Sequence, residues 1–210
     1  MEPDALAPYE AALRTAAPLT LRTVTGRSLR FDVARWLAPV DAADATVLDR
    51  CAGPVLDVGC GPGRFVASLT ARGAVALGVD IAETAVALTR GQGSPALLRS
   101  VFADLPGEGR WSTVLLVDGN IGIGGDPVRL LHRVAALLAP TGRVLVETAP
   151  DNTADERLSV RFTEQGDEVG PEFAWALVGA AALERYAADC GYAVAESWSS
   201  GGRTFVALSR

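Results

Sequence analysis

Five short apolar runs alternate with amphipathic segments in the chain from Pro54 onward. The runs are Val55 to Val58, Ala74 to Asp80, Ala96 to Phe102, Thr113 to Asp118 and Arg143 to Thr148. This alternation is typical of βαβ units, in which helices connect parallel strands and cover the sheet. The pattern therefore predicts five parallel strands in an α/β fold.

The predicted helices between these strands have recognisable ends. Two of them, Arg64 to Arg72 and Ala82 to Arg90, each run into a glycine, the usual residue of a left-handed helix end. A third opens at Asp126, a capping residue that is followed by Pro127 in the first turn. A fourth is predicted over Ala180 to Cys190.

Hairpins are predicted near both ends of the chain. Tyr192 to Ser199 and Arg203 to Leu208 flank a Gly-Gly turn, which indicates an antiparallel hairpin at the sheet edge. We expect a doubly wound, mainly parallel seven-stranded sheet that ends in this hairpin. Before Pro54 the pattern predicts a helix near Ala5 to Thr15, a hairpin over Leu19 to Val33 turning at Thr25-Gly26, and a helix opening near Asp41.

The length and composition favour one folded domain. The 210 residues are 49% hydrophobic and 21% charged, as in globular proteins. We expect a single domain, 1–210, made of an N-terminal region (1–53), a core (54–149), an inserted hairpin (150–179) and a C-terminal helix and hairpin (180–210).

Charge and hydropathy narrow the partners. The net charge of -6 opposes nucleic-acid binding by long-range repulsion, although a local arginine cluster would still permit it. No apolar run reaches the roughly 18 residues of a membrane span, and the acidic start does not resemble a signal peptide. We therefore expect a cytoplasmic protein. Cys51, Cys60 and Cys190 form no CxxC pair, so we also expect reduced thiols and no metal site.

The most informative segment is the glycine-rich turn after the first core strand, Val55 to Arg64, which reads VLDVGCGPGR. Glycines let a ligand approach the backbone, and the following helix N-terminus offers free N–H groups. A dinucleotide fingerprint would place its third glycine where Arg64 stands. The spacing is instead D-x-G-x-G-x-G.

This turn resembles the nucleotide-binding loop of class I S-adenosylmethionine-dependent methyltransferases. The resemblance extends over about Pro54 to Arg210 and is strongest in the loop. It implies that Asp57 orients the loop and the amino group of the cofactor, S-adenosyl-L-methionine. The residues that it places against the cofactor within the loop are Gly59, Cys60, Gly61 and Gly63.

The next strand ends in an acid, Asp80, which lies 23 positions after Asp57 in the sequence. A carboxylate at this place can accept hydrogen bonds from both ribose hydroxyls. The alternative is an exposed acid at a strand end, and in either case we expect Asp80 to contribute little to folding. The resemblance implies that Ile81 packs on the adenine, and the alternative for Ile81 is ordinary core burial.

The third core strand departs from the family pattern. Many members carry an acid there that contacts the adenine amino group, and Val101 occupies that position here. Asp104 is a possible substitute or, alternatively, a solvent-exposed loop acid. Phe102 is a candidate for flanking the adenine ring, although aromatic residues fill cores equally well.

The fourth core strand leads into a glycine-dense loop that contains Asp118 and Asn120. Ligands of open α/β sheets bind beyond the carboxyl ends of the strands, so both residues are candidates for catalytic roles, and Asp118 also for cofactor binding. The only histidine, His132, lies two turns into its predicted helix, so we expect it on the surface rather than as a base.

The acceptor region is predicted outside the core. Leu158 to Thr163 and Glu172 to Leu177 can pair as an added hairpin. Trp175, together with the N-terminal segment around Tyr9, Arg22 and Arg30, would then form an acceptor pocket, unless Trp175 belongs to the core. Apolar pockets with a few polar groups usually bind small molecules.

These observations favour methyl transfer from S-adenosylmethionine to an oxygen, nitrogen or carbon atom of a small molecule. Three alternatives remain: a cofactor-binding module without turnover, a nicotinamide oxidoreductase, which Arg64 disfavours, and a nucleic-acid or protein methyltransferase. The pattern predicts no particular oligomeric state.

Overall fold

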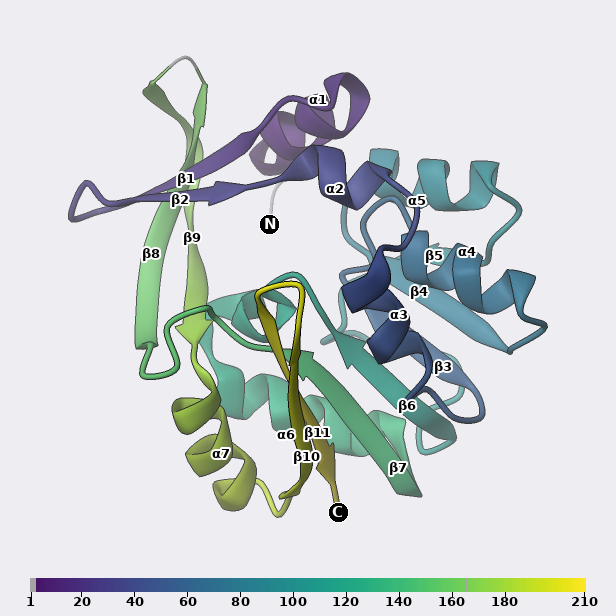
Figure 1. Ribbon diagram of the computed structural model, residues 1–210. Coiled ribbons are helices and arrows are strands. Elements are labelled where there is room, and N and C mark those ends of the chain that lie inside the picture. The colour runs from purple at the N-terminus through teal and green to yellow at the C-terminus, as the bar shows by residue number, and fades with distance from the viewer. Residues whose placement is uncertain (1–2, 165) are drawn as a thin grey trace.

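Seven strands form the main sheet of the computed structural model, which describes residues 3–164 and 166–210 (Figure 1). Their order across the sheet is β10-β11-β7-β6-β3-β4-β5. The bounds are β3 Val55–Val58, β4 Ala76–Asp80, β5 Ala96–Leu98, β6 Trp111–Leu116, β7 Leu138–Glu147, β10 Ala193–Ser200 and β11 Arg203–Ser209. Strands β3 to β7 are parallel, and β11 joins β7 in antiparallel register. The predicted fold class is confirmed.

Helices cover both faces of this sheet. One apolar core lies between the sheet and α6 and α7, and a second lies between the opposite face and α3 and α4. The helices are α3 Ala42–Leu48, α4 Arg64–Ala71, α5 Glu83–Gly91, α6 Pro127–Leu137 and α7 Ala180–Asp189. Asp41 and Asp44 form a reciprocal capping box at the start of α3, where the sequence predicts a helix to open.

A second sheet of four antiparallel strands lies over the carboxyl ends of the core strands, at the upper left of Figure 1. We call it the cap sheet, and its order is β2-β1-β8-β9. Its strands and the adjoining helices are η1 Pro3–Leu6, α1 Ala7–Thr15, β1 Leu19–Thr23, β2 Ser28–Phe31, α2 Val33–Leu37, β8 Asp155–Glu164 and β9 Asp167–Val178. The N-terminal hairpin and the inserted hairpin therefore form one layer.

Several predicted boundaries are wrong, among them the start of β7, which lies at Leu138 instead of Arg143, and two of them have a local cause. The N-terminal hairpin does not extend to Val33, because the side chain of Asp32 accepts a hydrogen bond from the Arg35 N–H and so begins helix α2. Strand β5 ends at Leu98 instead of Phe102, because the chain turns at Ser100, whose carbonyl accepts from the Ala103 N–H. Both elements are too short for their periodicity to mark an end.

Within the described residues, no helix has the length and apolar character that crossing a membrane requires.

Candidate functional site

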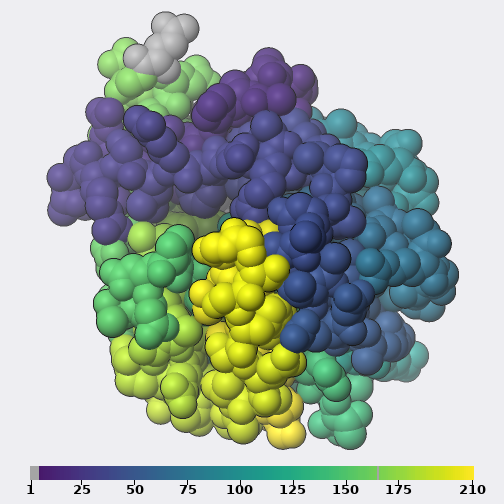
Figure 2. Space-filling model, in the orientation of Figure 1, coloured from purple at the N-terminus to yellow at the C-terminus, as the bar shows by residue number. Residues whose placement is uncertain are grey.

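A cavity of about 820 Å³ lies between the cap sheet and the carboxyl ends of the core strands. Its floor includes Gly59, Cys60, Gly61, Asp80 and Asn120, and its walls include residues of α1, β1, β8 and β9. Figure 2 shows how the N-terminal residues, in purple to dark blue, form a layer above the yellow tip of the C-terminal hairpin. The site thus combines the predicted core, which forms the floor, with the N-terminal region and the inserted hairpin, which form the walls.

Asn120 joins the loop after β6 to the glycine loop through hydrogen bonds. The Asn120 side-chain amide donates to the carbonyl oxygens of Val58, at 2.8 Å, and Gly59, at 2.9 Å. A Cβ atom on Gly59 would lie 2.8 Å from that amide nitrogen, so only glycine permits this approach. Because Asn120 also lines the cavity, its remaining carbonyl oxygen is available to a ligand.

Asp80 lies at the end of β4, on the cavity floor, and its side chain is fixed by two backbone groups. It accepts hydrogen bonds from the Gly61 N–H at 3.0 Å and the Ala82 N–H at 2.9 Å. Burial raises the pKa of this carboxyl, and these two hydrogen bonds oppose the rise. Each oxygen keeps a further lone pair for a ligand. The expectation that Asp80 is exposed is wrong, since only 7% of the residue is exposed. Its burial and its two hydrogen bonds argue against the expectation that it contributes little to folding.

The side chains next to Asp80 form an apolar slot. Ile81 and Leu98 are 42% and 45% exposed, and both line the cavity. Phe102 lines it too, with the guanidinium of Arg129 at 4.2 Å from its ring centroid. The core alternative for Ile81 is therefore excluded. Val101 also contributes to the lining, whereas Asp104 is exposed and lies outside it.

Two of the predicted cofactor residues lie outside the lining. Gly63 faces α5, and a Cβ atom there would lie 2.5 Å from the Thr89 side chain, so its glycine serves helix packing. Asp57 is only 3% exposed, and its Oδ2 has no hydrogen-bond partner in the described residues. Burial raises its pKa to about 7, against the opposing charge of Arg64. The roles predicted for both residues toward a cofactor stay predictions.

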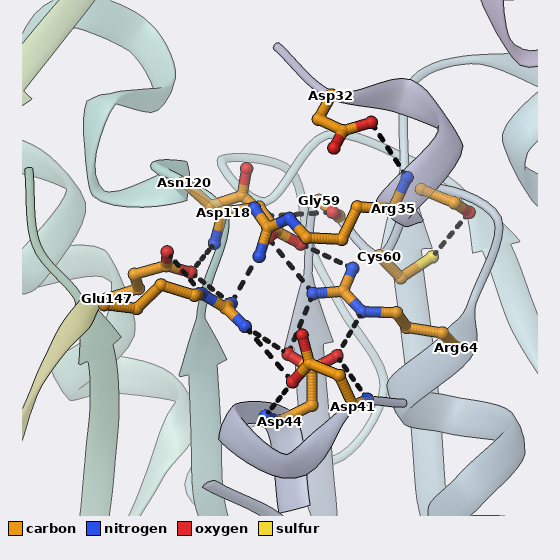
Figure 3. Close-up of polar contacts among 12 residues, drawn as sticks. Asp32, Arg35, Asp41, Asp44, Gly59, Cys60, Arg64, Asp118, Asn120 and Glu147 are labelled. Atoms are coloured by element: carbon orange, nitrogen blue, oxygen red, sulfur yellow. Dashed lines mark hydrogen bonds and ion pairs between the residues drawn. The ribbon is translucent and has the colours of Figure 1, made fainter. Parts of the chain in front are cut away.

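A buried ion network lies beside the glycine loop (Figure 3). Asp118 pairs with Arg64 at 2.6 Å, with Arg35 at 2.8 Å and, more distantly, with Arg203 at 3.5 Å. With its carboxylate committed to three guanidinium groups, Asp118 is suited to anchoring the loop rather than to accepting a proton. Its predicted catalytic role stays a prediction without support from this geometry.

Asp44 and Glu147 complete the network. Arg64 binds Asp44 at 2.8 Å, and Arg203 binds Asp44 and Glu147, both at 2.7 Å. Burial alone would raise the pKa of Asp44, but the hydrogen bonds from Arg64 and Arg203 hold it at about 2. No local pattern in the sequence marks Asp44, Glu147 and Arg203 as partners, because they meet only in the fold.

The side of the cavity that the cap sheet and α1 form, which we call its upper half, is aromatic. Tyr9 and Trp175 line it as predicted, but Arg22 and Arg30 do not. Side chains alternate between the two faces of a strand, and the register pairs Thr20 with Arg30 on the face opposite to that of the cavity-lining Leu21. The arginines therefore lie on the outer face of the cap sheet.

Tyr9 connects the two halves of the cavity. Its hydroxyl oxygen lies 3.4 Å from the position of a Cβ atom built on Gly61. Burial, together with the nearby charge of Asp80, raises the pKa of Tyr9 well above its usual value, so the group is a neutral phenol. His132 is exposed on α6 and lies outside the cavity, as the sequence predicted.

A family model described as a methyltransferase domain matches residues 30–197. The chain belongs to this methyltransferase family. The matched residues include the glycine loop, Asp80 and the loop after β6, so the cavity floor lies within the family domain. Among curated proteins, no sequence matches the chain significantly.

Solved structures share the fold of this methyltransferase. An S-adenosylmethionine-dependent methyltransferase from Bacteroides fragilis, in complex with S-adenosyl-L-homocysteine, superposes with a TM-score of 0.78 at 21% identity, covering 99% of this chain and 95% of that one. The 1,6-didemethyltoxoflavin-N1-methyltransferase of Burkholderia thailandensis gives 0.58 at 18% identity, covering 79% and 73%. A sugar N-methyltransferase from Streptoalloteichus gives 0.60 at 18% identity, covering 80% and 90%.

Proposed function

We propose that this methyltransferase transfers a methyl group from S-adenosylmethionine to a small-molecule acceptor. The observation that carries the proposal is the Asp80 carboxylate, which is buried at the cavity floor and held by the N–H groups of Gly61 and Ala82. Its free lone pairs fit a pair of ribose hydroxyls. The exposed apolar side chains of Ile81 and Leu98 fit the adenine beside it.

The residues present therefore fit the cofactor, whose sulfonium supplies an activated methyl group when bound. The contribution of the chain is binding and alignment. Asp80 would bind the ribose, while Asn120 keeps the glycine loop in place through its bonds to Val58 and Gly59. The cap sheet would cover the side of the cavity on which the acceptor binds.

A small acceptor is supported by the largely apolar lining of the upper half of the cavity. Two of the similar solved structures are named as methyltransferases of small molecules, a toxoflavin precursor and a sugar. The net charge of -6 disfavours a nucleic-acid substrate.

We also infer that residues 1–210 act as one domain in the cytoplasm, where the free thiols of Cys51, Cys60 and Cys190 would stay reduced.

Label transfer tests the proposal. The protein is incubated with methyl-labelled S-adenosylmethionine and a panel of small aromatic and amine acceptors, and the label in extracted products is counted. We expect transfer to at least one class of small molecule. Cofactor binding without transfer to any acceptor would instead support a module without turnover.

A further inference from the structure

The aromatic side chains of the protein are concentrated around the cavity. The sequence holds 13 aromatic residues, six Phe, four Trp and three Tyr, and seven of them line this one cavity. They are Tyr9, Phe31, Trp36, Phe102, Phe162, Phe173 and Trp175. The two cores of the main sheet consist mostly of Leu, Val and Ala instead. This distribution assigns the rings to the cavity rather than to the packing of the main sheet.

Trp36 and Trp175 leave part of their ring surface open to a ligand. Tyr9 meets Trp36 edge-on at 81°, and Phe31 meets Trp175 edge-on at 88°. In the described residues, the one pair stacked face to face is Trp198 with Phe205, outside the cavity. Trp36 and Trp175 remain only partly buried. Apolar surface left open to water is unfavourable, so an apolar ligand that covers it is stabilised.

The charges of the lining lie on the cofactor side. Asp80 and Asp118 are committed to the contacts described above. Glu10 accepts from the Thr84 N–H at the start of α5. Glu83, which also lines the cavity, is the first residue of α5 and follows Asp80 by three positions. The upper half of the cavity therefore offers a cationic acceptor no carboxylate among the described lining residues. An ammonium group would lose its hydration there without gaining an ion pair.

From these observations we propose that the acceptor is a flat, uncharged aromatic molecule, bound among the rings of Phe31, Trp36 and Trp175 with its reactive atom next to the Tyr9 hydroxyl. The inference rests on the proposed function and names its substrate class. An aminosugar, which is cationic and has no aromatic face, does not fit the same surface.

The lining also restricts the reacting atom. Tyr9 is a neutral phenol, which can donate a hydrogen bond to a ligand, and the charge of Asp118 is neutralised by arginines. The acceptor therefore supplies its own lone pair, from a ring nitrogen or an acidic ring hydroxyl. That lone pair forms the new bond to the methyl carbon, the S–CH₃ bond breaks, and its electron pair stays on sulfur. Any proton on the acceptor atom passes to water.

Calorimetry with two probes tests the inference. 6-Hydroxyquinoline and glucosamine are titrated separately into protein saturated with S-adenosylhomocysteine. We expect 6-hydroxyquinoline to bind at least tenfold more tightly than glucosamine. Trp36→Leu and Phe31→Leu keep an apolar side chain but remove the ring, so each should weaken 6-hydroxyquinoline binding roughly 3- to 10-fold. Neither should change S-adenosylhomocysteine affinity more than about twofold.

Trp198→Leu is the matched control, because Trp198 is a tryptophan outside the cavity. It should leave 6-hydroxyquinoline affinity unchanged, and melting curves identify the variants that fold. Tighter binding of glucosamine, binding of neither probe, or unchanged 6-hydroxyquinoline affinity in a folded ring variant would each overturn the inference. Failure of the wild-type protein to bind S-adenosylhomocysteine would overturn the proposed function instead, so the two failures are distinguishable.

Discussion

Asp118 combines an unusual backbone with a fully occupied side chain. Its φ of 58° lies in the left-handed region, which aspartate tolerates better than most residues. Its N–H donates to Glu147 at 2.7 Å, and its carboxylate binds Arg35, Arg64 and Arg203. The sequence marks Asp118 by its place after a core strand. It does not mark the arginines, since Arg203 lies 85 positions away in the chain.

Among single residues, His132 provides the simplest test of whether the reaction uses a general base. It is exposed on α6, away from the cavity, so His132→Ala should change turnover by less than about threefold. Steady-state kinetics with an acceptor that the protein methylates measures this change. A hundredfold loss in folded protein would show that the reaction uses a base that the geometry does not reveal.

Asp57 should make stability depend on pH. Its pKa is about 7 in the folded protein, against 3.8 for the same carboxyl in the unfolded chain, so the folded state binds more protons between these pH values. The free energy of unfolding should therefore fall by a few kcal/mol, at about 1.4 kcal/mol per pKa unit, as the pH rises from about 4 to 7. Asp57→Asn should remove this decline, as measured by urea unfolding at pH 5 and pH 8.

Asp44 does not obscure that measurement. Its pKa is lowered to about 2, so the stability it contributes is present above pH 4 and is lost only as the pH falls further. An unchanged decline between pH 5 and pH 8 in the Asp57→Asn variant would assign the effect to another group.

At the scale of elements, local signals predict the core but not the cap. Buried strands and capped helices carry their own patterns, so β3, β4, α4 and α6 lie close to the predicted bounds. The cap sheet depends on pairing between distant segments, with Leu21 opposite Phe162. No short-range pattern specifies such a partner. The sequence therefore predicts two hairpins and a shared pocket with Tyr9 and Trp175, but not the sheet that joins the hairpins. It also does not predict the other rings of the cap side of the cavity, Phe31, Trp36, Phe162 and Phe173.

The ion network should stabilise the packing of α4 against α3. Arg64 and Asp44 have side chains only 6% and 1% exposed, so Arg64→Met would leave buried carboxylates partly unpaired. We expect a loss of about 3 kcal/mol in the free energy of unfolding. Arg72→Met is the control, since Arg72 and Asp49 form an ion pair that is 46% and 69% exposed. Its loss should stay below about 1 kcal/mol in the same urea titration. Equal losses in the two variants would contradict a structural role for the network.

At the scale of the whole molecule, the site is assembled from both ends of the chain. Asp44 from α3 and Arg203 from β11 meet beside the glycine loop, and the cap sheet joins the N-terminal hairpin to the inserted one. The floor of the cavity belongs to the family domain and was predicted from motifs. The roof combines distant segments, so its aromatic character emerges only from the fold.

Calorimetric titration of wild-type and Asp80→Asn protein with S-adenosylhomocysteine tests the central claim most directly. We predict micromolar binding to the wild type and negligible binding of NADH. Asn in place of Asp80 loses the charge, so affinity should fall roughly 10- to 150-fold. Its amide would also oppose the Gly61 or Ala82 N–H, which should cost about 1–3 kcal/mol of stability. Asp104→Asn, at an exposed acid outside the cavity, should change neither quantity. NADH binding without S-adenosylhomocysteine binding, or unchanged affinity in folded Asp80→Asn protein, would contradict the account.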